Sequence, residues 1–282
     1  MTTVEQFTDI ILDDIAKNRL EFPTLPEVAL RVRKLVEDPN VSTVQVSRVI
    51  SADATLSSRL LQVANSAMFS GMPALDNIKA AVNRLGLALV RNMVTCVVMR
   101  SLYSPRYSAA IKAQLQELWR HSTKVAAFSH ALAKPYPQLR RDEAMLAGLI
   151  HDIGALPILT RAAKIPDIAN DPEKLQLVLE RLHGEIGRLV LQAWRFPETL
   201  VAVAAEHDDL NRINLGPIDY TDVVMVANLH SHLGTQHRYA KLDWSALPVF
   251  DRMHLSPQDS VQAIRAAQAE IAGVYALLGS RT

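Results

Sequence analysis

Apolar side chains recur at steps of three and four residues along nearly the whole chain. That spacing places them on one face of an α-helix, whereas the alternating β-branched runs typical of strands are hard to find. Proline and glycine residues divide the pattern into roughly a dozen segments of ordinary helix length. The sequence therefore predicts an all-α fold.

Residues that favour the start of a helix stand where several of these segments begin. Ser42 and Asp53 precede the expected helices at residues 44–51 and 55–64, and Pro197 opens a third. Serine and aspartate side chains accept hydrogen bonds from first-turn amides, and proline is tolerated at the first helical position. These local signals agree with the helical spacing.

The same interruptions indicate how the chain is organised. A Ser-Pro-Arg-Tyr-Ser stretch at residues 104–108 separates two long apolar helices, so we expect a lobe on either side of it. Residues 257–278 carry Ala and Ile at helical spacing and are expected to form a helix that serves either internal packing or a dimer contact. The expected units are an N-terminal helix over residues 1–21, a main domain over 22–240 with lobes 22–104 and 108–240, and a linker and helix over 241–282.

Composition limits the classes of partner. The chain has 282 residues, of which 49% are apolar, and this allows a substantial core. Its 30 Lys and Arg residues balance 29 Asp and Glu residues, for a net charge of +1. Local basic residues at Arg31, Arg33, Lys34, Arg140 and Arg141 are typical of solvated helix faces, so no nucleic-acid partner is expected.

The sequence also bears on the compartment. Its start, Met-Thr-Thr-Val-Glu, lacks the basic residues and apolar core of a signal peptide, so we expect a cytoplasmic protein. The most apolar stretch, residues 85–102, contains Arg91 and Arg100, so no membrane span is expected. Cys96 is the only cysteine and lies in the same stretch, where a small core residue is the natural interpretation.

Single histidines recur on the apolar faces of the expected helices. His183 begins a stripe that continues through Ile186 and Val190, so its side chain should point inward. His121 and His207 belong to similar stripes on two other segments. Three inward histidines on three helices are an unusual pattern.

A His-Asp pair follows another apolar run. His151 and Asp152 lie about 100° apart around a helix and could reach a common ion, and Gly148 and Gly154 should leave room nearby. Imidazole and carboxylate ligands suit Mn, Fe, Zn or Mg, and such ions activate water for phosphoester hydrolysis. The candidate metal ligands are His121, His151, Asp152, His183 and His207.

The alternative is that each histidine is a core residue bonded to a backbone carbonyl or a carboxylate. Three further histidines, His230, His232 and His237, do not share a helical face and are expected on the surface or in a loop. The residues alone leave both interpretations of the first set open.

Around these residues the chain resembles the HD superfamily of metal-dependent phosphohydrolases, and more closely its HDOD branch of bacterial signalling domains. The resemblance spans roughly residues 22–233 and implies a compact all-α domain used as a regulatory or interaction module. It is carried by ISADATL at 50–56, RLLQVANSAMF at 59–69, His121, HDIG at 151–154, HGEIG at 183–187 and His207.

The resemblance also shows departures from the catalytic pattern. Relatives that cleave cyclic dinucleotides carry a His-His pair where this chain has His207-Asp208, and an aspartate where we align Asn228. The Gly-Tyr-Pro motif of one catalytic branch is also not found. Because an amide provides no charge to hold an ion, the resemblance implies a partly preserved metal site.

Two functions follow as expectations. The first is a non-catalytic regulatory module that acts through a signalling protein partner, with a small nucleotide as a further candidate ligand and a homodimer as a candidate assembly. The second is a metal-dependent phosphohydrolase acting on a nucleotide or cyclic dinucleotide. In the second, the five ligands would hold the ion, and Lys124, one turn beyond His121, is either a phosphate contact or a solvated lysine.

Overall fold

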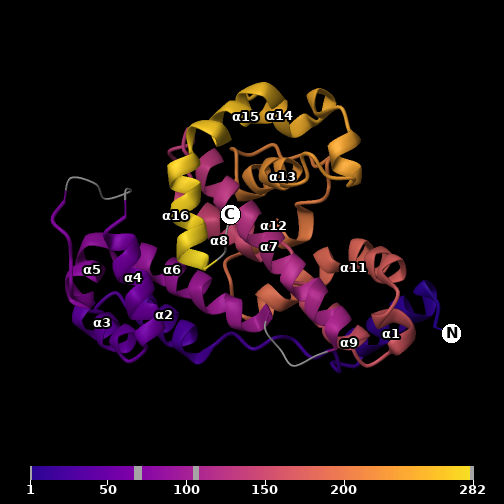
Figure 1. Cartoon of the computed structure of the whole chain (residues 1–282), viewed down its shortest axis with the longest axis horizontal. Coiled ribbons are helices and arrows are strands. Elements are labelled where there is room, and N and C mark those ends of the chain that lie inside the picture. The colour runs from indigo at the N-terminus through magenta and orange to yellow at the C-terminus, as the bar shows by residue number, and fades with distance from the viewer. Residues whose placement is uncertain (1, 67–71, 104–107, 280–282) are drawn as a thin grey trace.

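The computed structural model describes residues 2–66, 72–103 and 108–279, and helices dominate all three stretches (Figure 1). No strand occurs among these residues, so the predicted all-α class is confirmed. The first part holds α1 (Val4–Ala16), α2 (Glu27–Glu37), α3 (Thr43–Ser51), α4 (Ala54–Ala64), α5 (Ile78–Leu85), α6 (Leu87–Met99) and the 3₁₀-helix η2 (Arg100–Tyr103). The second holds α7 (Ala109–Leu132), α8 (Arg141–Ile150), α9 (Ala155–Ala162), α10 (Pro166–Ala169), α11 (Pro172–Ala193), α12 (Glu198–Glu206) and α13 (Tyr220–Ser231). The remainder holds η3 (Arg238–Lys241), η4 (Trp244–Ala246), α14 (Pro248–Arg252), α15 (Pro257–Ala266) and α16 (Gln268–Leu278).

The expected helix starts are confirmed. The Ser42 hydroxyl accepts a hydrogen bond from the third amide of α3, and the Asp53 carboxylate does the same for α4, at 3.3 and 3.0 Å. Helix α12 begins directly after Pro197. Each cap satisfies an amide that has no partner within its own helix.

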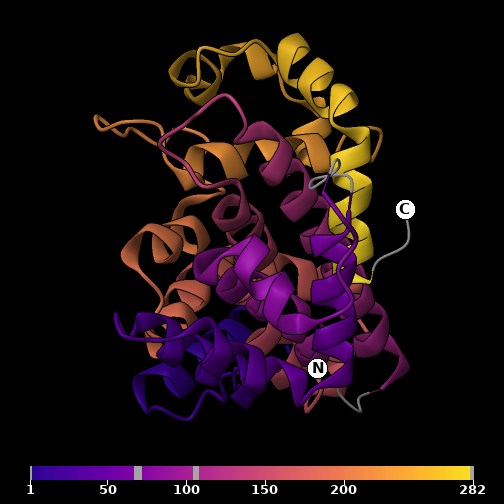
Figure 2. The same ribbon diagram turned by 90° about the vertical axis from the view of Figure 1, so that its left-hand side faces the viewer.

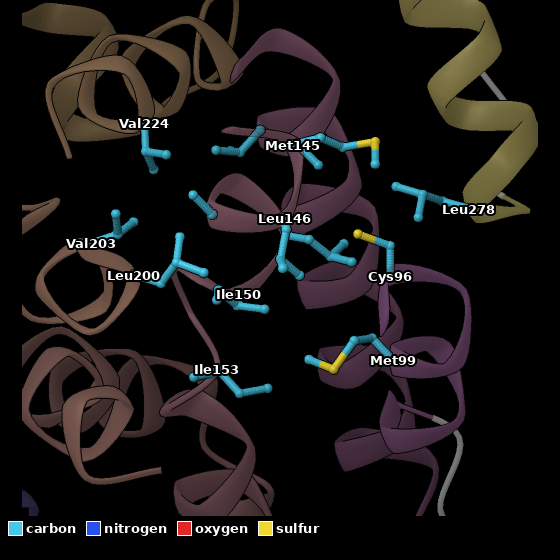
Figure 3. Packing of buried hydrophobic residues seen from close by; sticks show 14 of the residues in the cluster. Cys96, Met99, Met145, Leu146, Ile150, Ile153, Leu200, Val203, Val224 and Leu278 are labelled. Atoms are coloured by element: carbon cyan, nitrogen blue, oxygen red, sulfur yellow. The ribbon is translucent and has the colours of Figure 1, made fainter. Parts of the chain in front are cut away.

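The core is built around α7 and α8, which pack against each other along their length. Figure 3 shows Met145 and Leu146 of α8 beside Cys96 of α6, with Leu200 of α12 and Val224 of α13 on the opposite side. Cys96 is fully buried, as expected, and burial raises the pKa of its thiol. Apolar contacts therefore run without interruption from the α2–α6 helices to the helices that carry the histidines.

One described stretch, Arg141–Ala162, is long and apolar enough to cross a membrane. It comprises α8 and α9, and 83% of its most apolar window is buried inside the protein. Packing in the helical core accounts for its hydropathy. The stretch at 85–102, from which no span was expected, passes the same test only when joined across a bend of 113°.

The C-terminal helix differs from its expectation. Residues 257–278 form two helices, α15 and α16, that meet at Ala267. Helix α16 packs along α7 and also contacts α4 and α6 (Figures 1 and 2), and Arg100 donates to the Gly279 carbonyl at 3.0 Å. This face of α16 serves internal packing. The expected lobe boundary at 104–108 lies largely outside the described residues, and the proposed domain limits stay predictions.

Candidate metal centre

Four histidines and one aspartate converge from four helices. His121 lies midway along α7, and His183 lies on α11. His151 and Asp152 occupy the turn directly after α8, while His207 caps the C-terminal end of α12. All five residues that the sequence singled out therefore lie in one place.

Two glycines allow the helices to come this close. A Cβ atom on Gly148 would lie 2.9 Å from the Ala126 Cα of α7, and one on Gly154 would lie 2.0 Å from the His183 carbonyl oxygen. The sequence suggested that these glycines leave room near the ion. Instead they remove side chains from two helix contacts, which brings His151 and Asp152 against α7 and α11.

The Asp152 carboxylate is the centre of the cluster. Its Oδ2 lies 3.4 Å from the His121 Nε2 atom and 3.2 Å from that of His151. Its Oδ1 lies 3.5 Å from the His183 Nε2 atom and 3.2 Å from that of His207. The two groups that could hold a cation, His121–His151–Asp152 and Asp152–His183–His207, therefore share one carboxylate.

Hydrogen bonds on the far side of each ring fix its orientation. The Nδ1 atoms of His151, His183 and His207 donate to backbone carbonyls at 2.8, 2.7 and 3.0 Å. The His121 Nδ1 lies 3.4 Å from the Ser231 hydroxyl, which itself donates to the Asn228 carbonyl. With a proton on Nδ1, each ring directs its Nε2 atom at Asp152; this atom carries a lone pair when the ring is neutral and donates to the carboxylate when the ring is protonated.

This arrangement places the Nε2 atoms of neighbouring histidines against each other. The Nε2 atoms of His121 and His151 are 3.1 Å apart, and those of His183 and His207 are 3.3 Å apart. Lone pairs at that distance repel unless a proton or a metal ion lies between them. Ligands about 2.1 Å from one tetrahedral ion lie about 3.4 Å from each other, so the spacing fits a metal ion.

The electrostatics of the cluster also attract a cation. Burial alone would lower the pKa of His207, yet Asp208 and Asp152 raise that pKa to about 9. Burial would raise the pKa of Asp152, but His151, His207 and His183 hold it well below its usual value. The carboxylates are therefore charged at neutral pH and favour a positive charge among the rings.

Sequence reasoning missed one side chain of the cluster. Asp208, classed above as a departure from the catalytic pattern, lies 3.4 Å from the His183 Nε2 atom and 3.5 Å from that of His207. The amide of Asn228 donates to its Oδ1 at 3.2 Å. Its position beside His207, at the turn that ends α12, is the signal that could have identified it.

A cavity of about 420 Å³ opens beside the cluster. Its lining includes the carboxylates of Asp152 and Asp208 and the cationic side chains of Lys124 and Arg238. Lys124 donates to the Ser231 carbonyl at 2.6 Å, so it is held at the cavity rather than extended into solvent. A charged substrate could therefore approach the candidate ligands.

The remaining histidines correct an expectation. His230 is buried, and its Nε2 atom lies 2.6 Å from the Ser260 hydroxyl, so it belongs to the core. His232 lines the cavity, and its ring stacks on that of His237 at 3.7 Å between centroids. The surface or loop placement was wrong for His230 and missed the contribution of His232 to the cavity.

Comparisons with known proteins agree with this geometry. A structure from Shewanella amazonensis SB2B, called a "putative metal-dependent phosphohydrolase", is 30% identical, covers 99% of this chain and 100% of its own, and superposes with a TM-score of 0.83. An HDOD domain protein of unknown function from Geobacter sulfurreducens, 20% identical over 97% of this chain and 99% of its own, shares the fold with a TM-score of 0.67.

A curated relative, an uncharacterised protein from Treponema pallidum (strain Nichols), is 26% identical over 222 residues. The match covers 73% of this chain but 41% of that relative, so the chain spans less than half of its length. The model of the HDOD domain matches residues 22–210. Since this match covers well over half of the sequence, the chain belongs to the HDOD family.

Proposed function

We propose that the protein binds divalent metal at the His-Asp cluster and hydrolyses a phosphoester in the adjoining cavity. The observation that carries the proposal is the convergence of four Nε2 atoms on the Asp152 carboxylate. Similarity to the Shewanella protein over the full chain supports it. The non-catalytic role favoured by the sequence rested on the HDOD resemblance and on an incomplete ligand set, and that count left out the Asp208 carboxylate, which lies beside the cluster.

The residues that would hold the ion are His121, His151, Asp152, His183 and His207. A donor set rich in imidazole favours Mn, Fe or Zn over Mg, which prefers oxygen ligands. When bound, such an ion supplies Lewis-acid polarisation of a phosphoryl oxygen and lowers the pKa of a coordinated water.

The side chains around the cavity suit a phosphorylated substrate. Lys124 has two N–H donors beyond the one that its carbonyl contact uses, and Arg238 lies over the Tyr239 ring at 4.9 Å. Both can bind and orient phosphate oxygens beside Asp152. A nucleotide or cyclic dinucleotide is the substrate class that we propose.

The test is hydrolysis by chelator-stripped protein reloaded with Mn, Fe, Zn or Mg, assayed on a chromogenic phosphodiester and on cyclic dinucleotides. We expect metal-dependent turnover that His151→Gln lowers by about 100-fold or more. His254→Gln, at an exposed histidine in the turn after α14, is the matched control and should retain activity. Absence of turnover with every metal would refute the hydrolase.

A second candidate, a regulatory domain acting through a protein partner, is favoured by one surface feature. Ile213 and Leu215, between α12 and α13, are 85% and 97% exposed. Arg252 bonds to the carbonyls of Gly216 and Pro217 and so holds this loop in place. Exposed apolar side chains on a braced loop are typical of a protein contact.

Crosslinking in cells tests this second role. A defined partner band should disappear in the Ile213→Ser/Leu215→Ser variant and persist in Leu177→Ser, which removes an exposed leucine from α11. Equal bands in both variants would exclude the loop as the contact.

A further inference from the structure

We propose that Asp208 is a further ligand of the metal ion at the His183–His207 position, and that Asn228 and Tyr239 are the residues that position it. The inference rests on the proposed metal site and goes further by assigning a second carboxylate to it. Asp208 is not among the five ligands that were expected from the sequence.

The geometry places two carboxylates and two imidazoles around one space. The Nε2 atoms of His183 and His207 face Asp152 Oδ1 at 3.5 and 3.2 Å; the first also lies 3.4 Å from Asp208 Oδ2 and the second 3.5 Å from Asp208 Oδ1. These separations match the distance of about 3.4 Å between neighbouring ligands of a tetrahedral ion. Two nitrogens and two oxygens are a donor set typical of Zn, Mn or Fe.

The charge balance supports the same assignment. Because the Nδ1 atoms of His183 and His207 are held as donors by carbonyls, both rings are neutral when they present lone pairs. The two carboxylates then contribute a charge of about −2 that a divalent ion neutralises. Without Asp208, the position would keep one carboxylate, which is shared with the His121–His151 pair.

Neighbouring side chains fix the position of the Asp208 carboxylate. The Asn228 side-chain amide donates to its Oδ1 at 3.2 Å, and the Tyr239 hydroxyl lies near the same carboxylate. Asn228 is 4% exposed and lies on α13, so its amide is fixed by the core. A carboxylate at position 228 would repel Asp208, whereas the neutral amide binds it; the asparagine therefore complements an aspartate at 208.

The experiment measures metal affinity, because activity alone does not separate binding from chemistry. Chelator-stripped wild type, Asp208→Asn and Asp209→Asn are titrated with Zn and Mn by calorimetry. Asp209 is the exposed neighbour and serves as the matched control. We expect Asp208→Asn to weaken binding at least about tenfold or to remove one equivalent of metal, while Asp209→Asn binds like the wild type.

Two further variants guard against a folding defect in Asp208→Asn. Tyr239→Phe keeps the carboxylate but removes the hydroxyl beside it, and should weaken binding about tenfold. The exchange Asp208→Asn/Asn228→Asp restores one carboxylate to the pocket and should recover part of the lost affinity. Circular dichroism of the metal-free forms reports whether each variant is folded.

The outcomes separate the two proposals. If wild type binds metal and Asp208→Asn binds it equally well, Asp208 is not a ligand and the proposed function stands. If the wild type binds no metal, both proposals fail. Loss of affinity confined to Asp208→Asn and Tyr239→Phe supports the assignment.

Discussion

The orientation of the histidine rings is decided by single hydrogen bonds. Each Nδ1 donor has an acceptor in or beside the helix that carries its ring, such as the Gly148 carbonyl for His151 and the Leu179 carbonyl for His183. These bonds fix the tautomer before any ligand arrives. The cluster is therefore preorganised. Buried core histidines make the same bonds to carbonyls, so it is the convergence of four Nε2 atoms on the Asp152 carboxylate that favours a cation site.

Gly154 should tolerate no side chain. In Gly154→Ala the new Cβ would lie 2.0 Å from the His183 carbonyl and 2.3 Å from the Gly187 amide, so α9 and α11 must separate. We expect a loss of about 1–3 kcal/mol in the free energy of unfolding, measured with urea, and weaker metal binding. Gly273→Ala in α16 meets nothing within 4 Å and should instead stabilise by up to about 1 kcal/mol. An unchanged free energy of unfolding in Gly154→Ala would contradict the close contact between α9 and α11.

His121, His183 and His207 could be predicted from the sequence because each belongs to an apolar stripe or ends one, and inward direction follows from helical spacing. Asp208 could not be found in this way, since α12 ends at Glu206 and the direction of the next side chains depends on the turn. The same limit applies to His151 and Asp152, which lie after α8 and not on it. Helical spacing carries no information there.

Among the helices, α1 is attached to the part of the molecule that carries the candidate metal centre. It packs on α11, and the Asp14 carboxylate accepts a hydrogen bond from Arg161 of α9 at 2.7 Å (Figure 1). The Arg161 guanidinium lowers the pKa of Asp14 from its ordinary 3.8. An ion pair between two elements thus couples the N-terminal helix to α9.

Removing this pair should destabilise the protein in a pH-dependent way. Because the pKa of Asp14 is lower in the folded than in the unfolded state, its stabilisation is complete above 3.8 and is lost as the pH falls through the folded value. We expect Asp14→Asn to lower the free energy of unfolding, measured with urea, by about 1–3 kcal/mol at pH 7 and by less near pH 3. Asp9→Asn, at an exposed position of α1, is the control. A cost that does not change with pH would rule out the ion pair as its cause.

The starts of helices were predicted well because their signals are local: Ser42 and Asp53 each bond to an amide three residues ahead. The break at Ala267 was not predicted, because alanine favours a helix and no local residue interrupts it. Tertiary contacts determine the position of this break between the two helices. Helix α15 packs near His230 through Ser260, while α16 turns to follow α7 and reach α4.

At the scale of the whole molecule, the core joins the α2–α6 helices to the metal-centre helices through α8 (Figure 3). One face of α8 packs on α6, and its C-terminal end leads directly into His151 and Asp152. The position of the candidate ligands therefore depends on both parts of the chain. This is why composition and periodicity predicted the helices but not how they assemble around the site.

The most direct test of the metal centre is elemental analysis of the purified protein beside the Asp152→Asn variant, with Asp209→Asn as the control. Asp152 contacts all four ring nitrogens, so its loss affects both candidate positions at once. We predict near-stoichiometric Mn, Fe or Zn in the wild type and in Asp209→Asn, and little in Asp152→Asn. Wild-type protein that is free of metal and takes up none on titration would contradict the proposed metal centre.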